Sequence, residues 1–270
     1  MKKLDLSIIV VNWNTKKLTV DCVKSIISSK PGVSYEIIMV DNASADGSVG
    51  ALRELERKKV RLIENKNNLG FARGVNLGAR GARGKYLFLL NSDTKMARNY
   101  IDELIHFAKN ASEAGVVGTK LLNIDRSIQP SCYRLPTLWR SIRQYWLGEE
   151  KILDKYVPSG EDPVEVESVV GASFLITPEA RSKVGLLDER YFMYFEDLDY
   201  CRSVRKAGLK VYYLPNVEVV HYHGASGNKA AGNKDQLERL TRSSMIYHGI
   251  IRHYLIWFVM WSGQKLRLVI

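Results

Sequence analysis

The sequence is poor in cysteine, and the cysteines it has form no recognisable pairs. Its three cysteines, Cys22, Cys132 and Cys201, are widely spaced and include no Cys-x-x-Cys motif. This pattern predicts neither a disulfide framework nor a zinc site and is typical of a protein of the reducing cytosol. No apolar run near the amino terminus is long enough for a signal peptide. We therefore expect a cytoplasmic protein.

The sequence also lacks the common glycine-rich phosphate motifs and long apolar runs. Neither Gly-x-Gly-x-x-Gly nor Gly-x-x-x-x-Gly-Lys-Ser/Thr occurs in it. A membrane-spanning helix needs about 20 apolar residues, and the apolar stretch 254–261 is shorter than that. These absences argue against a dinucleotide-binding enzyme, a P-loop nucleotidase and an integral membrane protein.

Negative charge is in deficit. Forty Lys and Arg against 29 Asp and Glu give a formal net charge of +11. An excess of this size favours anionic partners such as nucleotides, phospholipid head groups or nucleic acid. Because the chain has neither a nucleic-acid-binding motif nor a repeated basic and aromatic strip, we expect no nucleic-acid partner.

The first half of the chain alternates short β-branched runs with helical patterns. Such alternation is typical of a mostly parallel sheet covered by helices, and 270 residues suffice for one large α/β domain. Thr15 is expected to cap the first helix. The predicted strands are 6–11, 36–40, 60–63, 86–90, 116–118, 165–170, 174–176, 210–214 and 217–220. Polar loops follow the early strands, and in open α/β sheets such loops form the ligand crevice.

Two later segments depart from this alternation. Residues 121–163 form an excursion with one predicted helix, 138–147, whose Trp139, Tyr145 and Trp146 are expected to form a lid or an acceptor wall. Residues 224–232 are small and polar, which predicts a loop.

The block 185–202 carries an acidic cluster on an aromatic platform. Residues 191–195 are apolar and aromatic, and they lead Glu196, Asp197 and Asp199 into the first turn of a predicted helix that ends at Gly208. Acids in a first turn are favoured by the helix dipole, so simple capping fits this pattern. A catalytic rim fits it as well.

Several loops offer polar groups to a ligand. Asp41 ends a buried strand, where its carboxylate could accept the ring N–H of uracil or thymine or could instead close a turn. The loop 67–76 combines glycines with amides, which suits either base recognition or a strand-to-helix turn. Asp93 follows the apolar strand 87–90 and could bind Mg²⁺ or Mn²⁺, with His221 as a candidate second ligand.

Together these motifs resemble the inverting glycosyltransferases of family 2, and in particular their bacterial rhamnosyltransferase-like branch. The resemblance covers about residues 6–226. It rests on Asn12-Trp13-Asn14, Asp41-Asn-Ala-Ser-x-Asp-Gly-Ser, Asn68-x-Gly-Phe-Ala-x-Gly-x-Asn76, Leu89-Leu-Asn91-Ser-Asp93, Gly171-Ala-Ser-Phe-Leu, the block 185–202 and His221-x-x-Gly-x-Ser226.

The resemblance implies a GT-A fold, with one Rossmann-like, mostly parallel sheet flanked by helices and a C-terminal helical tail. Residues 1–228 would form the glycosyltransferase domain, in which 1–120 bind the nucleotide and 121–228 form the acceptor and catalytic half. Residues 229–270 would form the basic, partly apolar tail.

The resemblance also implies roles for individual residues. Asp197 would be the general base and Glu196 would orient it or the acceptor, while Asp93 and His221 would bind the metal. Gly171, Ala172, Ser173 and Tyr194 would line the donor sugar and acceptor. The implied nucleotide-binding residues are Val11, Asn12, Asn14, Asp41, Asn42, Asn68, Gly70, Phe71, Gly74, Asn76, Asn91 and Ser92.

One position departs from the family pattern. Asn91 stands where the family's Asp-x-Asp motif has its first carboxylate. The loss of one charge lowers the expected affinity for Mg²⁺ or Mn²⁺, so we expect basic residues to share in neutralising the diphosphate.

The implied activity is transfer of a sugar, with inversion, to a hydroxyl of a glycan or lipid-linked glycan during cell-surface polysaccharide biosynthesis. L-Rhamnose from dTDP-rhamnose is the leading donor, and a UDP-sugar is the other. The alternative is a nucleotide-sugar-binding protein without turnover, docked on a membrane or a partner.

The tail suggests a place for the protein in the cell. From residue 229 onward, seven Lys and Arg stand against two acids, a net charge of +5. With the aromatic stretch 254–261, this favours peripheral contact with the inner face of the plasma membrane. A helix packed on the core fits the same stretch equally well.

Overall fold

The computed structural model describes residues 4–56, 59–222 and 233–267. The predicted loop 224–232 and the predicted boundary between residues 228 and 229 lie outside the described residues. The strands are β1 (Leu4–Asn12), β2 (Tyr35–Asp41), β3 (Val60–Glu64), β4 (Gly84–Asn91), β5 (Thr94–Met96), β6 (Ala114–Leu122), β7 (Ile128–Gln129), β8 (Cys132–Tyr133), β9 (Val164–Val166), β10 (Ser168–Val169), β11 (Ser173–Ile176) and β12 (Lys210–His221). The helices are α1 (Lys16–Ser29), α2 (Ser48–Arg53), α3 (Phe71–Arg80), α4 (Tyr100–Asn110), α5 (Leu138–Tyr145), α6 (Pro178–Val184), α7 (Glu196–Lys206), α8 (Asn233–His248) and α9 (Ile250–Arg267).

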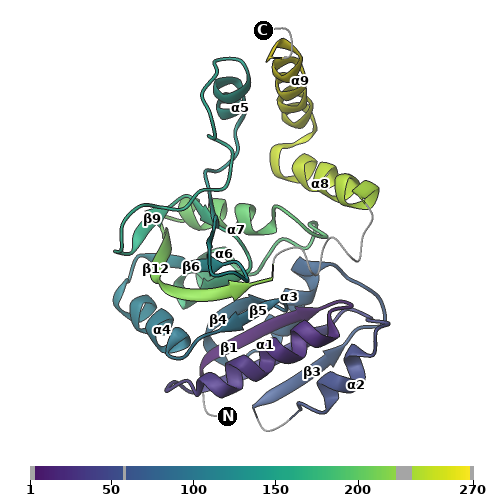
Figure 1. The fold of residues 1–270 in the computed structure, drawn as a ribbon, viewed down its shortest axis with the longest axis vertical. Helices are drawn as coiled ribbons and strands as arrows, with labels where there is room; N and C mark the ends of the chain where they lie inside the picture. The colour runs from purple at the N-terminus through teal and green to yellow at the C-terminus, as the bar shows by residue number, and fades with distance from the viewer. Residues whose placement is uncertain (1–3, 57–58, 223–232, 268–270) are drawn as a thin grey trace.

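One ten-stranded sheet runs through the molecule (Figure 1). Its strand order is β3-β2-β1-β4-β11-β6-β12-β5, with β7 beside β6 and β9 beside β12. The first four strands in this order are parallel, whereas β11 runs antiparallel between β4 and β6. The carboxyl ends of the parallel strands therefore meet at one edge, where a ligand crevice is expected.

Both faces of the sheet are buried under helices. Along β1, Leu6, Ile8 and Val10 join the core cluster under α1, α2 and α4, while Ile9 joins the cluster under α3, α6 and α7. Successive side chains of a strand point to opposite faces, so an uninterrupted apolar strand needs cover on both. This explains why the first strands read as continuous apolar runs.

The predicted strands are confirmed with two corrections, and the predicted cap of the first helix needs a third. Segments 210–214 and 217–220 form one strand, β12, whose pairing with β6 shifts between Leu214 and Glu218, next to Pro215. Segment 165–170 is divided into β9 and β10. Thr15 precedes α1, but its hydroxyl donates to Asn12 Oδ1 at 2.8 Å and does not cap the helix.

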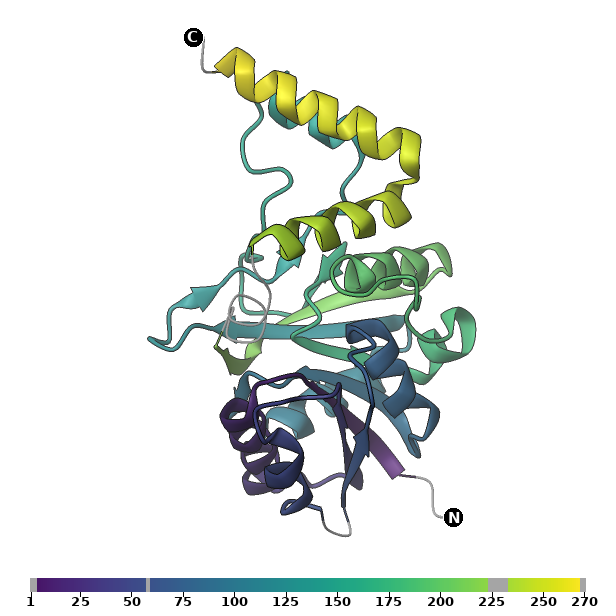
Figure 2. The same cartoon turned by 90° about the vertical axis from the view of Figure 1, so that its right-hand side faces the viewer.

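Helices α5 and α9 lie side by side and project away from the sheet (Figures 1 and 2). Trp146 Nε1 donates to Ser262 Oγ at 2.9 Å, and the Trp146 ring meets Phe258 edge to face. A Cβ at Gly263 would lie 2.5 Å from the carbonyl oxygen of Tyr145, so glycine permits this close approach. The predicted helical tail is confirmed, and α5 packs on it.

Candidate active site

A cavity of about 550 Å³ opens where β4, the segment before β11 and the first turn of α7 meet. Ligand pockets commonly have volumes of about 300–1,000 Å³. The cavity is lined by Phe71, Asn91, Asp93, Gln129, Tyr133, Arg134, Pro136, Leu153, Lys155, Val170, Gly171, Ala172, Met193, Tyr194, Phe195, Glu196, Asp197, Leu198, His221, Gln236 and Leu240.

Asp197 is held at the cavity wall by two backbone N–H groups. Gly171 N donates to Asp197 Oδ2 at 2.9 Å, and Leu198 N donates to Oδ1 at 2.8 Å. Burial raises the pKa of Asp197 above its ordinary value, and these N–H groups and the charge of Lys155 oppose that rise. The carboxylate is thus fixed in place and made more basic than an exposed aspartate.

The backbone leading to Asp197 is strained. Tyr194 and Phe195 have φ values of 73° and 68°, which side-chain-bearing residues rarely adopt. Phe195 is also the N-cap residue of α7, so the strained pair ends where the acidic helix begins. Such strain costs about 1–3 kcal/mol per residue and is common at functional sites.

Glu196 lies deeper than Asp197. The side chain is 8% exposed, and its Oε2 has no hydrogen-bond partner among the described residues. Burial, with the neighbouring charge of Asp197 as a second cause, raises the pKa of Glu196 to about 8. At neutral pH the pair therefore keeps one proton, and we assign that proton to the more deeply buried Glu196.

Asp93, which follows β4, and His221, which ends β12, lie close together. Asp41 ends β2, which lies nearer the other end of the strand order. His221 Nε2 lies 3.3 Å from Asp93 Oδ1, and both side chains are more than nine-tenths buried. In an octahedral site with bonds of about 2.1 Å, neighbouring ligand atoms lie about 3 Å apart, so the two atoms fit one divalent cation. Among the described residues no third His, Cys, Asp or Glu joins them. Further ligands would have to come from the diphosphate and from water.

The predicted nucleotide-binding residues divide into two groups. Phe71 and Asn91 line the cavity, while the other ten predicted residues are absent from its described lining. Asp41 is fully buried, where its oxygens accept hydrogen bonds from Asn12 Nδ2 at 2.6 Å and from Ser44 N and Oγ at 2.9 and 2.7 Å. In this structure Asp41 closes the turn after β2.

The loop before α3 is tied to the segment that leads to α7. Phe71 N donates to Phe192 O at 2.7 Å, and Asn76 Nδ2 and Oδ1 bond the backbone of Leu187 at 2.8 and 3.1 Å. Gly70 has φ 84° and ψ 176°, and a Cβ there would lie 2.4 Å from Phe192 O. Asn76 and Gly70 thus contact the segment that leads to α7, and neither belongs to the described cavity lining.

The remaining amides of this region also serve the loops. Asn42 Nδ2 donates to Gly70 O at 3.0 Å, and Asn68 Oδ1 accepts from Gly70 N at 2.9 Å. Asn14 Oδ1 accepts from Ala45 N at 2.7 Å. Val11 packs beside Gly74, and Ser92 Oγ lies 3.1 Å from Thr15 Oγ1. These contacts shape the crevice edge.

Of the predicted sugar-pocket residues, Gly171, Ala172 and Tyr194 line the cavity. Ser173 does not, because its side chain lies in the core. Its Oγ lies 2.5 Å from the Tyr100 hydroxyl and 2.8 Å from Thr119 Oγ1. Ser173 therefore joins a buried hydroxyl cluster that links β11 to α4 and β6.

The excursion 121–163 was expected to form a lid or an acceptor wall, but sequence reasoning named the wrong residues for it. Tyr133, Arg134 and Lys155 line the cavity, whereas the expected lid residues on α5 do not. Burial lowers the pKa of the Lys155 ammonium, and the charge of Asp197 opposes this shift. Arg134 and Lys155 thus bring basic side chains to the same cavity as Asn91, the residue that replaces the first carboxylate of the family motif. In the sequence, both residues lie in an irregular segment near Pro136 and Pro158, and this was the signal that could have marked them as loop residues near a site.

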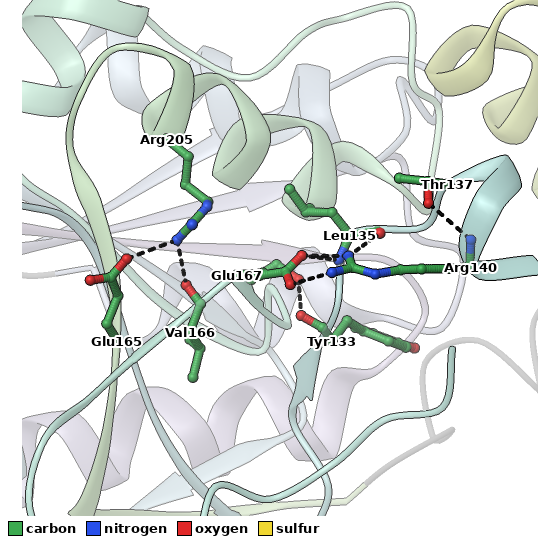
Figure 3. Close-up of polar contacts among 9 residues, drawn as sticks. Tyr133, Leu135, Thr137, Arg140, Glu165, Val166, Glu167 and Arg205 are labelled. Carbon is green, nitrogen blue, oxygen red and sulfur yellow. Dashed lines mark hydrogen bonds and ion pairs between the residues drawn. The ribbon is translucent and has the colours of Figure 1, made fainter. Parts of the chain in front are cut away.

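Ion pairs anchor this wall of the cavity (Figure 3). Arg140 in the first turn of α5 bonds Glu167 through both of its terminal nitrogens, each at 2.6 Å, and also donates to Leu135 O at 2.7 Å. Arg205 of α7 donates to Glu165 and to Val166 O. The segment that carries Tyr133 and Arg134 is thus fastened beside α7.

Comparisons with known proteins point to one family. The family model described as "Glycosyl transferase family 2" matches residues 7–150. The N-acetylglucosaminyl-diphospho-decaprenol L-rhamnosyltransferase of Mycobacterium tuberculosis is 31% identical over 70% of this chain and 67% of its own length. The dTDP-rhamnosyl transferase RfbF of Shigella flexneri is 25% identical over 73% of this chain and 62% of its own.

A solved structure supports the fold. The crystal structure of GalNAc-T7 with UDP, GalNAc and Mn²⁺ matches with a TM-score of 0.63 and 18% identity, over 82% of this chain and 44% of that one. The predicted GT-A fold is thereby confirmed. The chain spans less than half of that neighbour and about two thirds of the relatives above.

Proposed function

The chain belongs to glycosyl transferase family 2, and from this premise we propose that it transfers a sugar from a nucleoside-diphosphate donor to a hydroxyl group with inversion at the anomeric carbon. The observation that carries the proposal is the fixed carboxylate of Asp197 at the wall of a cavity that also holds Asp93 and His221. A single displacement needs a base on one face of the sugar and a stabilised leaving group on the other. The cavity supplies groups suited to both.

In the proposed reaction, Asp197 Oδ accepts the proton of the acceptor hydroxyl. The acceptor oxygen forms a bond to the anomeric carbon as the bond to the diphosphate oxygen breaks, and the diphosphate leaves with the electron pair. Gly171 N and Leu198 N keep the carboxylate oriented throughout. Protonated Glu196 offers a hydrogen bond to a sugar hydroxyl and adds no negative charge beside the base.

The leaving-group side would use cations. Asp93 and His221 would bind Mg²⁺ or Mn²⁺, which supplies positive charge to the departing diphosphate. Arg134 and Lys155 line the same cavity and would supply the charge that the substitution of Asn91 for a carboxylate makes necessary. The residues around Asp41 and the 68–76 loop would bind the nucleoside beside the cavity, which Phe71 and Asn91 line. In this proposal residues 1–120 bind the nucleotide and 121–228 the acceptor.

L-Rhamnose from dTDP-rhamnose is the donor we propose first, since two of the relatives carry rhamnosyltransferase names. A UDP-sugar is second. A lipid-linked or free glycan would be the acceptor, in cell-surface polysaccharide biosynthesis.

We also propose peripheral contact with the cytoplasmic face of the plasma membrane through α9 and α5. The α9 helix exposes Ile250, Ile251, Tyr254, Leu255, Trp257, Phe258 and Trp261, and α5 and the turn after it add Trp139, Trp146 and Leu147. The α9 sequence contains Arg252, Lys265 and Arg267 and no acid. Aromatic rings and basic residues together suit the head-group region of an anionic bilayer. No described helix is long and apolar enough to cross a bilayer.

The test of the activity is transfer from dTDP-rhamnose and UDP-sugars to a panel of glycan and lipid-linked acceptors, with the stereochemistry of the product read by NMR. An inverted product supports the proposal. A retained anomer would overturn the single displacement, and nucleotide binding without transfer or donor hydrolysis across the panel would favour the alternative of a non-catalytic nucleotide-sugar-binding protein.

A further inference from the structure

A relay of side-chain hydrogen bonds leads from the turn between β6 and β7 to the ring of His221. His221 Nδ1 lies 2.7 Å from Gln129 Oε1, and Gln129 Nε2 donates to Asn123 Oδ1 at 2.9 Å. Asn123 Nδ2 donates to Ser127 Oγ at 2.9 Å, and the Ser127 hydroxyl donates to Asp125 Oδ1 at 2.6 Å. The five side chains form one continuous path.

The direction of this path is fixed by its outer end. An ionised carboxylate accepts hydrogen bonds and cannot donate one. The hydrogen bond from the Ser127 hydroxyl lowers the pKa of Asp125, which favours this ionised form. The single hydroxyl hydrogen of Ser127 therefore points to Asp125, so Ser127 Oγ must accept from the Asn123 amide. Because the Asn123 amide donates from Nδ2 to Ser127, its oxygen Oδ1 faces Gln129.

The same rule carries the direction inward to the histidine. Asn123 Oδ1 accepts from the Gln129 amide, which leaves Gln129 Oε1 facing His221. Because an amide oxygen cannot donate, the hydrogen of this contact belongs to His221 Nδ1. In a neutral imidazole the second nitrogen, Nε2, then has the lone pair, and it is Nε2 that faces Asp93 Oδ1 at 3.3 Å.

We propose that Gln129 is a positioning residue, directed by Asn123, Ser127 and Asp125, that selects the His221 tautomer able to bind a divalent cation together with Asp93. This inference rests on the proposed function, in which that cation meets the donor diphosphate. Metal-binding histidines commonly donate their other N–H to an oxygen acceptor, and loss of that acceptor lowers metal affinity about 10- to 100-fold. Gln129 lies at the cavity wall on the two-residue strand β7.

The test measures Mn²⁺ binding in the presence of UDP or dTDP, with free Mn²⁺ detected by electron paramagnetic resonance. Gln129→Leu removes the acceptor, and we expect Mn²⁺ affinity to fall about 10- to 100-fold. Gln129→Glu keeps an oxygen acceptor for Nδ1–H, so this variant should bind Mn²⁺ at least as tightly as the wild type does. The ring ¹⁵N chemical shifts of His221 should show a hydrogen on Nδ1 in the wild type and a mixture of tautomers in Gln129→Leu.

Asn123→Ala provides a second variant in case Gln129→Leu does not fold, because Asn123 lies in an exposed turn. It frees the Gln129 amide to rotate, so we expect a smaller loss of affinity and some loss of tautomer selection. Equal Mn²⁺ affinity and an unchanged tautomer in these variants would overturn this inference and leave the proposed function standing. Failure of the wild type to bind Mn²⁺ with either nucleotide would overturn the inference together with the proposed cation.

Discussion

The cavity and the α5–α9 projection place side chains in opposite environments. In the cavity, carboxylates that water would solvate well are enclosed, and Glu196 is 8% exposed. On the projection, apolar side chains that the core would accept remain in solvent, and Ile251 is 78% exposed. Each arrangement lowers stability relative to the ordinary distribution of residues. For this reason we place the two proposed functions in these regions, sugar transfer in the cavity and membrane contact on the projection.

The largest effect is expected from removing the proposed base, which should abolish most of the activity of the cavity and leave the function of the projection intact. Asp197→Asn should lower kcat about 10²- to 10⁴-fold, since a neutral amide cannot accept the acceptor proton. Vesicle binding should not change. Asp199→Asn is the matched control, because Asp199 lies in the same helical turn but pairs with Arg202 and is not part of the described cavity lining. Wild-type turnover by Asp197→Asn would remove Asp197 from the mechanism.

The second variant should have the converse effect. The double substitution Ile251→Glu and Trp257→Glu introduces two negative charges on the exposed face of α9, and we expect binding to phosphatidylglycerol vesicles to weaken at least about tenfold. Transfer to a water-soluble acceptor should be retained. Ile27→Glu changes a partly exposed isoleucine on α1 as the control. Undiminished flotation of the double variant with vesicles would end the membrane proposal.

A third prediction concerns the stability cost of the buried acid. Burial raises the pKa of Glu196 to about 8, so the folded chain retains a proton that the unfolded chain releases above the ordinary pKa of glutamate. The stability of the wild type should therefore fall as pH rises from about 4.5 to 8. Glu196→Gln has no proton to release, so its Tm should exceed that of the wild type by at least about 3 °C at pH 8.5 and by less at pH 5.

Scanning calorimetry at the two pH values checks this, with Glu103→Gln on the exposed side of α4 as the control. A Tm difference that is independent of pH would show that Glu196 is already ionised in the folded chain.

The smallest expected effect lies within the projection. Trp146→Phe keeps the edge contact with Phe258 but removes the hydrogen bond to Ser262, which is worth about 0.5–1.5 kcal/mol at most. We expect Tm to fall by about 1–3 °C and hydrogen exchange in α9 to increase, with exchange in β1 unchanged. Trp139→Phe is the control, since Trp139 is 61% exposed. Equal exchange in both variants would show that this bond does not hold α9.

Local patterns made the fold and the acidic block predictable. Strands β1, β2 and β4 are mostly apolar on both faces and end in Asn12, Asp41 and Asn91. Both their positions and the crevice therefore follow from the sequence. The first turn of α7 is equally legible, because its three acids are consecutive in the chain or nearly so.

Side-chain direction was not predictable in the same way. Asn76 and Ser173 belong to family motifs, yet Asn76 bonds Leu187 and Ser173 bonds Tyr100. These partners lie 111 and 73 residues away in the chain, so no local sequence pattern can predict the contacts. The presence of Lys155 and Gln129 at the cavity was unpredictable for the same reason, because both belong to the irregular excursion. The contact of Trp146 with Ser262 spans 116 residues.

The contact between Gly70 and Phe192 has a consequence for mutational tolerance. A backbone at φ 84° and ψ 176° is open almost solely to glycine, and any side chain would also collide with Phe192 O. At Gly50, by contrast, a Cβ would have no atom of the described residues within 4 Å, apart from its chain neighbours and its own helix backbone. A saturation library selected only for folding should return many residues at position 50 and glycine alone at position 70.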